Sequence, residues 1–407
     1  MPNLDEAEQQ IQTIAATIAQ VAHSSDGNIL AIHGGGTKPA LYARHAAKSE
    51  DLSRRAAKSY SEPAPAATAI DTRPLNGIIQ YQPGEFLITA YAGTTLQELT
   101  NVLAEQGQYL PFDPPRVAKV SETSQATLGG AVASGINGPG RWRYGGIRDF
   151  VMECRFVDGQ GKIRVGGRRV VKNAAGFDIP KLLTGSCGRF GMLADVTVKV
   201  FPRPVSSLTI HVFSENLEAA AATISQVAMQ PWELDALEIQ PDGSLLIRIA
   251  GEETAVSQHS SRLQKTLPSS GCSFLVNQQQ DLAWQARHQW IWDNPEMVVV
   301  RVPLNIRVML DLDEELEEME IQRCYGSGGN VAWLKWEPQK ENPGSRLKRV
   351  SKLLAQFGLR GMLVHLPASV QELMPGLMVG TNPENPFYNR LKQVFDPFHV
   401  FGEFDAA

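Results

Sequence analysis

The chain has 407 residues, of which 43% are hydrophobic and 20% are charged, and its formal net charge is -5. These proportions are typical of a soluble globular protein, and the length favours two or three domains; a disordered or fibrous chain is excluded. The small negative charge gives no general basic surface for nucleic acid.

The first residues are predicted to form an amphipathic helix that precedes a short strand and a glycine-rich loop. Apolar side chains recur at helical spacing at Leu4, Ile11, Ile14, Ile18 and Val21. Residues 28–32 favour a buried strand that leads directly into the loop at residues 33–38. Residues 43–69 have no clear periodicity, and we interpret them as an exposed excursion.

Two strands and a helix are predicted next. The strands, at residues 77–81 and 86–91, flank a turn that contains a proline. A helix begins at residue 96, since Thr95 is a suitable N-cap and Glu98 follows three residues later. Gly107 marks the end of this helix.

A hairpin and a proline-rich boundary follow. Residues 150–157 and 163–165 favour two antiparallel strands joined by the sequence Asp-Gly-Gln-Gly. A further strand at residues 196–201 is stopped by Pro202 and Pro204, which we interpret as a domain boundary.

The second half is predicted to be another α/β unit. Its expected strands are residues 207–213, 237–240 and 245–250, and its expected helices are residues 217–229 and 254–267. The acidic residues 311–320 are interpreted as the solvated face of a helix.

No metal site or membrane span is expected. The four cysteines, Cys154, Cys187, Cys272 and Cys324, lack the spacing of zinc or iron–sulfur ligands. No apolar run approaches the ~20 residues of a membrane helix, and the acidic N-terminal sequence is unlike a secretory signal. We therefore expect a cytoplasmic protein, whose contact with a membrane, if it has one, is made only through a partner.

Two glycine-rich stretches predict a phosphate-containing ligand. Glycines accept positive φ angles and let backbone N–H groups surround an anion. The first loop is Gly34-Gly35-Gly36-Thr37, and a second stretch follows at residues 126–130. Two such stretches favour a long dinucleotide, and a flavin is the leading candidate. Lys38 either adds positive charge to the first loop or is an ordinary exposed lysine.

Four motifs in a fixed order resemble the FAD-binding domain of the vanillyl-alcohol oxidase type, also called the PCMH type. They occupy residues 126–135, 143–151, 172–178 and 182–191. Within this family, residues 110–115, the motif at 172–178 and the weakly patterned second half make the chain most similar to FAD-binding subunits of glycolate oxidases. The resemblance implies an α+β fold with an FAD-binding domain of two α/β lobes (1–205), an α/β cap domain (206–385) and a C-terminal segment (386–407) that returns to the first domain.

The resemblance also assigns residues to FAD. They are Gly34, Gly35, Gly36 and Thr37 in the first loop, Thr127, Leu128, Gly129, Gly130, Ser134 and Gly135 in the second, and Gly138, Tyr144, Gly145, Gly185, Ser186, Gly188, Gly191 and Met192 farther along. Covalent flavin attachment in this superfamily commonly uses a histidine or a cysteine at defined loop positions, whereas His33 precedes the glycines. Non-covalent FAD is therefore expected.

The resemblance implies oxidation of glycolate to glyoxylate, beside a homologous catalytic flavin subunit and an iron–sulfur subunit. Such chemistry needs a cation for the substrate carboxylate and a base for the hydroxyl proton. The candidates in the second half are His288, Arg301, Arg307 and His365, although His365 is also interpretable as a core histidine. The paired histidines of metal-assisted relatives are not visible. Two alternatives are a self-sufficient 2-hydroxy-acid or alcohol dehydrogenase and a non-catalytic assembly subunit.

Overall fold

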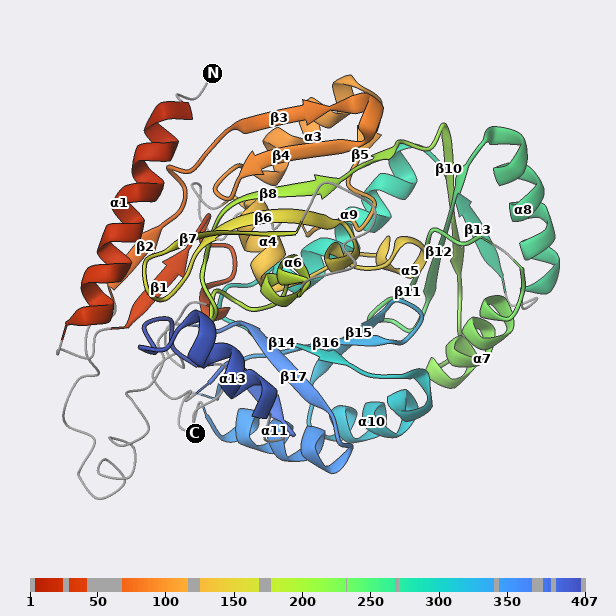
Figure 1. Ribbon diagram of the computed structural model, residues 1–407. Helices are drawn as coiled ribbons and strands as arrows, with labels where there is room; N and C mark the ends of the chain where they lie inside the picture. The colour runs from red at the N-terminus through yellow and green to blue at the C-terminus, as the bar shows by residue number, and fades with distance from the viewer. Residues whose placement is uncertain are drawn as a thin grey trace.

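The computed structural model has an α+β architecture, as predicted (Figure 1). It describes residues 4–24, 29–41, 68–115, 125–167, 177–231, 233–267, 271–339, 344–367, 376–381 and 386–403. The predicted excursion at 43–69 lies outside these ranges, except for its last two residues, which begin strand β2. Residues 172–176 of the third motif also lie outside them.

The first lobe combines one helix with two short strands. Helix α1 (Leu4–His23) packs Ile11, Ile14 and Ile18 into a core, as their helical spacing predicts. Strands β1 (Leu30–His33) and β2 (Thr68–Asp71) pair in parallel, with His33 opposite Asp71. The first glycine loop therefore begins where β1 ends.

The second lobe is built on a five-stranded sheet. In spatial order its strands are β3 (Ile78–Gln82), β4 (Leu87–Tyr91), β8 (Met192–Lys199), β6 (Val151–Val157) and β7 (Ile163–Gly167). Helices α3 (Leu96–Glu105), α4 (Leu128–Ser134) and α6 (Ile179–Leu183) pack on it. Two short strands, β5 (Gln108–Tyr109) and β9 (Phe201–Pro202), pair with each other in a separate two-stranded sheet. The predicted β6–β7 hairpin is present, with Val157 opposite Ile163.

The predicted N-cap of α3 is present, and it makes a small stability test. The Thr95 hydroxyl accepts a hydrogen bond from the Glu98 backbone N–H at 3.1 Å. We expect Thr95→Ala to lower the free energy of unfolding by about 1 kcal/mol, because that N–H loses its partner. Urea denaturation will measure the change. Thr95→Ser keeps the acceptor and is the control, so equal losses in both variants would contradict the capping role.

Residues 206–381, called the cap below, form a nine-stranded sheet. Its order is β13 (Cys272–Leu275), β10 (Ser206–Val212), β12 (Leu245–Gly251), β11 (Ala236–Ile239), β15 (Gln322–Gly326), β16 (Val331–Trp336), β14 (Val298–Pro303), β17 (Arg360–His365) and β18 (Met378–Gly380). Four helices share the large core on its outer face: α7 (Leu217–Ala228), α8 (Glu253–Thr266), α10 (Ile306–Glu318) and α11 (Ser345–Gln356). Helix α9 (Gln278–Trp292) lies between this sheet and the N-terminal half (Figure 1).

The C-terminal residues contact both lobes of the N-terminal half. Helix α13 (Pro386–Phe395) places Phe395 in the core of the second lobe, and Val400 accepts a hydrogen bond from the Leu30 N–H of the first lobe at 2.7 Å. The buried Lys392 ammonium donates to Asp396, to the Gly402 carbonyl and to the Arg189 carbonyl. We propose the domain division at residues 205 and 385 on these contacts and on the separation of the two large sheets.

Charged side chains join the two halves. The Arg248 guanidinium, on β12, contacts Asp113 of the N-terminal half and Asp235 of the cap. Arg143, on the short helix α5 (Arg141–Tyr144), donates to Glu233 at 2.6 Å and to the Ala250 carbonyl at 3.1 Å. These contacts hold the loop around α5 against the cap.

Candidate functional site

A cavity of about 710 Å³ opens between the two lobes of the N-terminal half, and we call it the cradle cavity. The first loop, residues 34–38, forms one wall, and residues 127–134 together with residues 186–193 form the other. Much of the lining is glycine or another small residue, so backbone atoms are close to the space. Such a surface suits a long ligand that lies against the main chain.

The first loop presents unused hydrogen-bond donors to the cradle cavity. Among the described residues, the backbone N–H groups of Gly34, Gly35, Gly36 and Thr37 have no acceptor. Gly36 has φ +72°, a conformation that glycine adopts without strain. A Cβ on Gly35 would lie 1.5 Å from the Gln125 carbonyl oxygen, so only glycine fits there. Clustered free N–H groups of this kind bind anions such as a pyrophosphate.

Lys38 is buried beside these donors, which decides between its two interpretations. Its side chain is only 7% exposed, lines the cradle cavity and donates to the Thr37 hydroxyl at 3.3 Å. Among the described residues it has no carboxylate partner. Burial lowers the pKa of Lys38 to about 8, although the nearby Cys187 thiol acts in the opposite direction. The interpretation as an exposed lysine is wrong, and the ammonium is placed to face a bound anion.

The second loop differs from the expectation, because its N–H groups are already used. The Leu128 N–H donates to the Thr94 carbonyl at 2.9 Å, and the Gly129 N–H donates to the Ala92 carbonyl at 2.7 Å. The Gly130 N–H donates to the Thr127 hydroxyl, the N-cap of α4, at 3.2 Å. These contacts anchor α4 to the sheet. The backbone of the second loop therefore lies close to the cavity but offers few free N–H donors to a ligand.

The structure brings most of the residues assigned to FAD to the cradle cavity. Those that line it are Gly34, Gly35, Gly36, Thr37, Thr127, Gly129, Gly130, Ser134, Ser186, Gly188 and Gly191. Six others line neither this cavity nor the second one described below: Leu128, Gly135, Tyr144, Gly145, Gly185 and Met192. Leu128 and Met192 are fully buried in the cores of the lobes, and the rest sit in turns or aromatic contacts behind the lining. Gly138 lines a different cavity.

Cys187 also lines the cradle cavity, although the sequence reasoning did not assign it. It lies in the motif at residues 182–191, between Ser186 and Gly188, and its N–H donates to the Ala133 carbonyl at 2.8 Å. Burial raises the pKa of the Cys187 thiol to about 11, and the nearby Arg189 and Lys38 only partly offset this. The thiol is therefore protonated at neutral pH and is a weak nucleophile.

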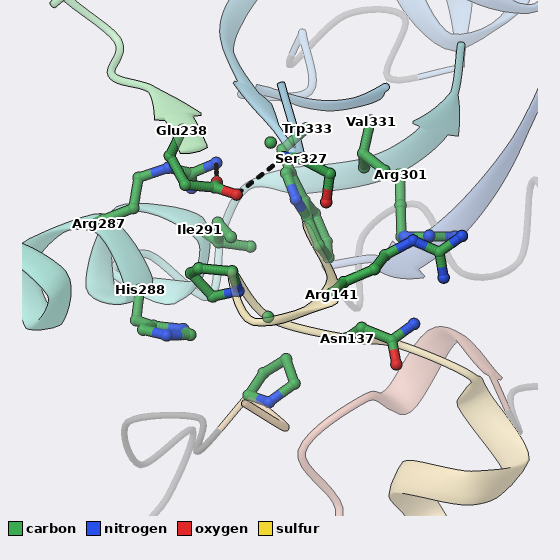
Figure 2. A pocket seen from close by; sticks show the side chains of 14 residues that line it. Asn137, Arg141, Glu238, Arg287, His288, Ile291, Arg301, Ser327, Val331 and Trp333 are labelled. Carbon is green, nitrogen blue, oxygen red and sulfur yellow. Dashed lines mark hydrogen bonds and ion pairs between the residues drawn. The ribbon is translucent and has the colours of Figure 1, made fainter. Parts of the chain in front are cut away.

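A second cavity, of about 430 Å³, lies where the cap meets the N-terminal half, and we call it the interface cavity (Figure 2). Its floor is the segment after α4, with Asn137, Gly138, Pro139 and Arg141. A Cβ on Gly138 would lie 2.1 Å from the Asp113 carbonyl oxygen, so this glycine is needed for packing against residues 111–113. Residues 129–134 line one cavity and residues 137–141 the other, so a single segment runs along both.

Charged groups of the cap line the interface cavity. The buried Glu238 carboxylate accepts hydrogen bonds from Arg287 and from the Ser327 N–H, both at 2.9 Å. Burial raises the pKa of Glu238, and Arg287 counteracts this shift. His288 and Arg301, two of the predicted catalytic candidates, also line the cavity. Arg287 and Glu238 were missed, because each is a single charged residue in an element whose neighbours are unremarkable in sequence.

The other two catalytic candidates are not brought to either cavity. Arg307 is exposed near the start of α10. His365 is 6% exposed, and its Nδ1–H donates to the Met297 carbonyl at 2.8 Å. Burial lowers the pKa of His365, and the hydrogen bond to the Met297 carbonyl and the charge of Glu296 offset this only in part. The interpretation of His365 as a core histidine fits this position, and neither Arg307 nor His365 lines the two cavities.

The comparisons with known proteins agree with this geometry. A family model described as an FAD binding domain matches residues 54–167. The chain is 33% identical over 333 residues to the glycolate oxidase subunit GlcE of Escherichia coli K12, covering 82% of this chain and 85% of that protein. The chain belongs to the GlcE family of FAD-binding proteins. The predicted resemblance to FAD-binding subunits of glycolate oxidases is thereby confirmed.

Two more distant similarities bear on the family and on the fold. The glycolate oxidase subunit GlcD of Bacillus subtilis is 28% identical over 38% of this chain, a match that spans about a third (31%) of that protein. A solved alkyldihydroxyacetonephosphate synthase superposes with a TM-score of 0.62 at 17% identity, covering 98% of this chain and 74% of that one. The structural likeness supports the predicted fold class and nothing about activity.

Two further features are absent from the described residues. None of the helices in the described ranges is long and apolar enough to cross a membrane. Within the same ranges, no cluster of three or more histidine, cysteine, aspartate or glutamate side chains is arranged to hold a metal ion.

Proposed function

We propose that this chain is the FAD-binding subunit of a glycolate oxidase-type enzyme that oxidises glycolate to glyoxylate. The observation that supports it most is the first loop, where four free N–H groups and the buried Lys38 surround one space. A dianionic pyrophosphate accepts hydrogen bonds from the donors and also compensates the positive charge of the ammonium, which a neutral ligand cannot do. Membership of the GlcE family supplies the reaction.

Bound FAD would supply the hydride acceptor for oxidation of a CH–OH group. The residues of the first loop would hold its pyrophosphate, with Lys38 neutralising charge. Thr127, Gly129, Gly130 and Ser134 would line the middle of the ligand, since they form the facing wall of the cradle cavity. The flavin ring would then lie toward the interface cavity, because residues 134–138 lead from one cavity to the other.

We propose that FAD is held without a covalent bond. His33 lies on β1 and does not line the cradle cavity, and Cys187 is a protonated thiol at neutral pH. We expect Cys187→Ser to keep the FAD content and affinity within twofold of the parent. Trichloroacetic acid precipitation of both proteins should leave all of the yellow colour in the supernatant. Colour that stays in the parent's pellet and leaves the pellet of the variant would contradict the proposal.

We also propose that the chain works beside a GlcD-like flavin subunit and an iron–sulfur subunit in the cytoplasm. The similar proteins of Escherichia coli and Bacillus subtilis are both named as glycolate oxidase subunits. The four cysteines of this chain lie too far apart in sequence for a cluster motif, so an iron–sulfur cluster that accepts electrons from the flavin would belong to another chain.

The test is the visible absorption spectrum of the chain purified alone, recorded before and after anaerobic addition of glycolate. A flavin spectrum that glycolate does not bleach supports the dependent subunit. Bleaching by glycolate would identify a self-sufficient dehydrogenase instead. A colourless protein that refuses added FAD would overturn the assignment of the first loop and leave only an assembly role.

A further inference from the structure

We infer that Arg141 and Arg301 form a binding site for the carboxylate of a small organic acid, so that this chain carries its own substrate or product subsite. The two guanidinium groups meet in the interface cavity from opposite sides of the domain junction. Arg141 comes from α5 of the N-terminal half, and Arg301 comes from β14 of the cap. Figure 2 shows the two side chains directed toward each other.

The interface cavity has an excess of positive charge. Three guanidinium groups line it, from Arg141, Arg287 and Arg301, against the single carboxylate of Glu238. That carboxylate is already paired with Arg287 and with the Ser327 N–H. Arg287 is 3% exposed, and its Nε has no hydrogen-bond partner among the described residues. A buried donor without an acceptor is unfavourable unless a ligand supplies one.

The pKa of Arg301 is lowered in this cavity. Among the described residues, neither Arg301 nor Arg141 has an ion pair or a side-chain hydrogen bond. Burial, and to a smaller extent the positive charge of Arg141, lower the pKa of Arg301 to about 10. Two like charges that face each other in a poorly solvated space are stabilised by an anion between them.

The register position of Arg301 on β14 determines the face of the sheet from which its side chain projects. In the antiparallel pair β14–β16 it lies opposite Trp333, so both side chains project from the same face of the sheet. That face is covered by α9, whose Ile291 also lines the cavity. The Arg141 guanidinium lies close to Gly146, since a Cβ built on that glycine would be 2.6 Å from an Arg141 terminal nitrogen.

The lining of the cavity limits the kind of ligand. Trp333, Ile291 and Val331 give it apolar walls beside the cations, which suits a short carbon chain with one carboxylate. The choice of a 2-hydroxy acid such as glycolate, or the matching 2-oxo acid, rests on the proposed function. The proposal of an anion site depends only on the charged side chains of the interface cavity.

The test is isothermal titration of the FAD-loaded full-length chain with oxalate, a stable mimic of both acids, in a buffer without other carboxylates. We expect saturable binding that Arg301→Met and Arg141→Met each weaken by about tenfold to hundredfold. FAD affinity, measured separately by flavin fluorescence, should stay within twofold. Arg301→Lys should restore part of the binding, which separates loss of charge from misfolding. Arg307→Met is the matched control, because Arg307 is exposed outside both cavities.

Three results would overturn the inference. The first is a parent protein that binds FAD and no oxalate. The second is oxalate binding that neither methionine variant changes. The third is a loss of FAD affinity in both variants with oxalate binding intact, which would assign the cations to the flavin ring. A parent protein that binds oxalate but refuses FAD would instead overturn the proposed function and leave the anion site standing.

Discussion

Replacing Lys38 by methionine is expected to weaken FAD binding about 100-fold and to make the FAD-free protein more stable. Both effects have one cause, the burial of an ammonium group without a carboxylate partner in the cradle cavity. In the complex the ammonium gains a charged hydrogen-bond acceptor, and a bond of this kind contributes about 1.5–3 kcal/mol. Quenching of flavin fluorescence on titration with apoprotein measures the loss.

The stability of the FAD-free protein should respond to pH in a defined window. The pKa of Lys38 in the folded chain is about 8, below the ordinary 10.5 of an unfolded lysine. Below pH 8 the group is charged in both states, and burial of the charge costs on the order of 3 kcal/mol. As pH rises from 8 to 10.5 the unfolded chain binds more protons, so stability increases. Lys38→Met removes this increase and raises the melting temperature at pH 7.

FAD affinity should have the opposite dependence on pH. A bound phosphate favours the charged ammonium, so it raises the pKa of Lys38 above 8. Affinity is then constant below pH 8 and falls as pH rises above it, by at most tenfold for each pH unit. Lys38→Met should bind FAD weakly at every pH from 7 to 9.5.

Lys348→Met is the matched control for these measurements, because Lys348 is exposed on α11 of the cap. It should change neither FAD affinity nor the pH profile. A Lys38→Met variant with parental affinity would show that the ammonium does not contact the ligand. A variant that loses affinity together with melting temperature would point to a structural role for Lys38.

The local features of this fold were predictable from sequence, because neighbouring residues determine them. The helical spacing of the first residues, the Thr95 N-cap and the β6–β7 hairpin each depend on contacts within a few residues. The first glycine loop belongs to the same class, since its free N–H groups follow from the conformations of consecutive glycines.

Features that depend on distant segments were not predictable. The N–H groups of Leu128 and Gly129 are used by carbonyls of Thr94 and Ala92, which no local pattern indicates. Lys38 is buried at a cavity that residues of the motif at 182–191, far away in the sequence, also line. The approach of Arg141 to Arg301 arises only when the cap docks. Single charged residues carry no periodic signal, so sequence reasoning named Arg301 among four candidates and missed Arg141.

Replacing Arg248 by methionine is expected to lower the free energy of unfolding by about 3–5 kcal/mol, because it strands a buried carboxylate. Arg248 contacts Asp113 across the domain junction and Asp235 within the cap, and its guanidinium lies 4.9 Å from the centroid of the Trp284 ring. Burial lowers the pKa of Arg248, but the two carboxylates outweigh burial and raise it. Asp235 is only 3% exposed, and its Oδ1 already has no partner among the described residues. Urea denaturation followed by circular dichroism measures the loss.

A double variant distinguishes the stranded charge from lost packing. Asp235→Asn combined with Arg248→Met removes the buried charge, so we expect it to be more stable than Arg248→Met alone. Arg262→Met, on the exposed face of α8, should change stability by no more than about 0.5 kcal/mol.

Asp113 also accepts a hydrogen bond from the Gly140 N–H at 3.0 Å, one residue before Arg141. The double variant should therefore also bind oxalate more weakly than the parent protein. In this variant Asp113 still accepts the hydrogen bond from Gly140, but it has lost its contact with Arg248 of the cap, so the loop that carries Arg141 is held less firmly. Parental oxalate affinity in the double variant would show that the loop keeps its position without this ion pair.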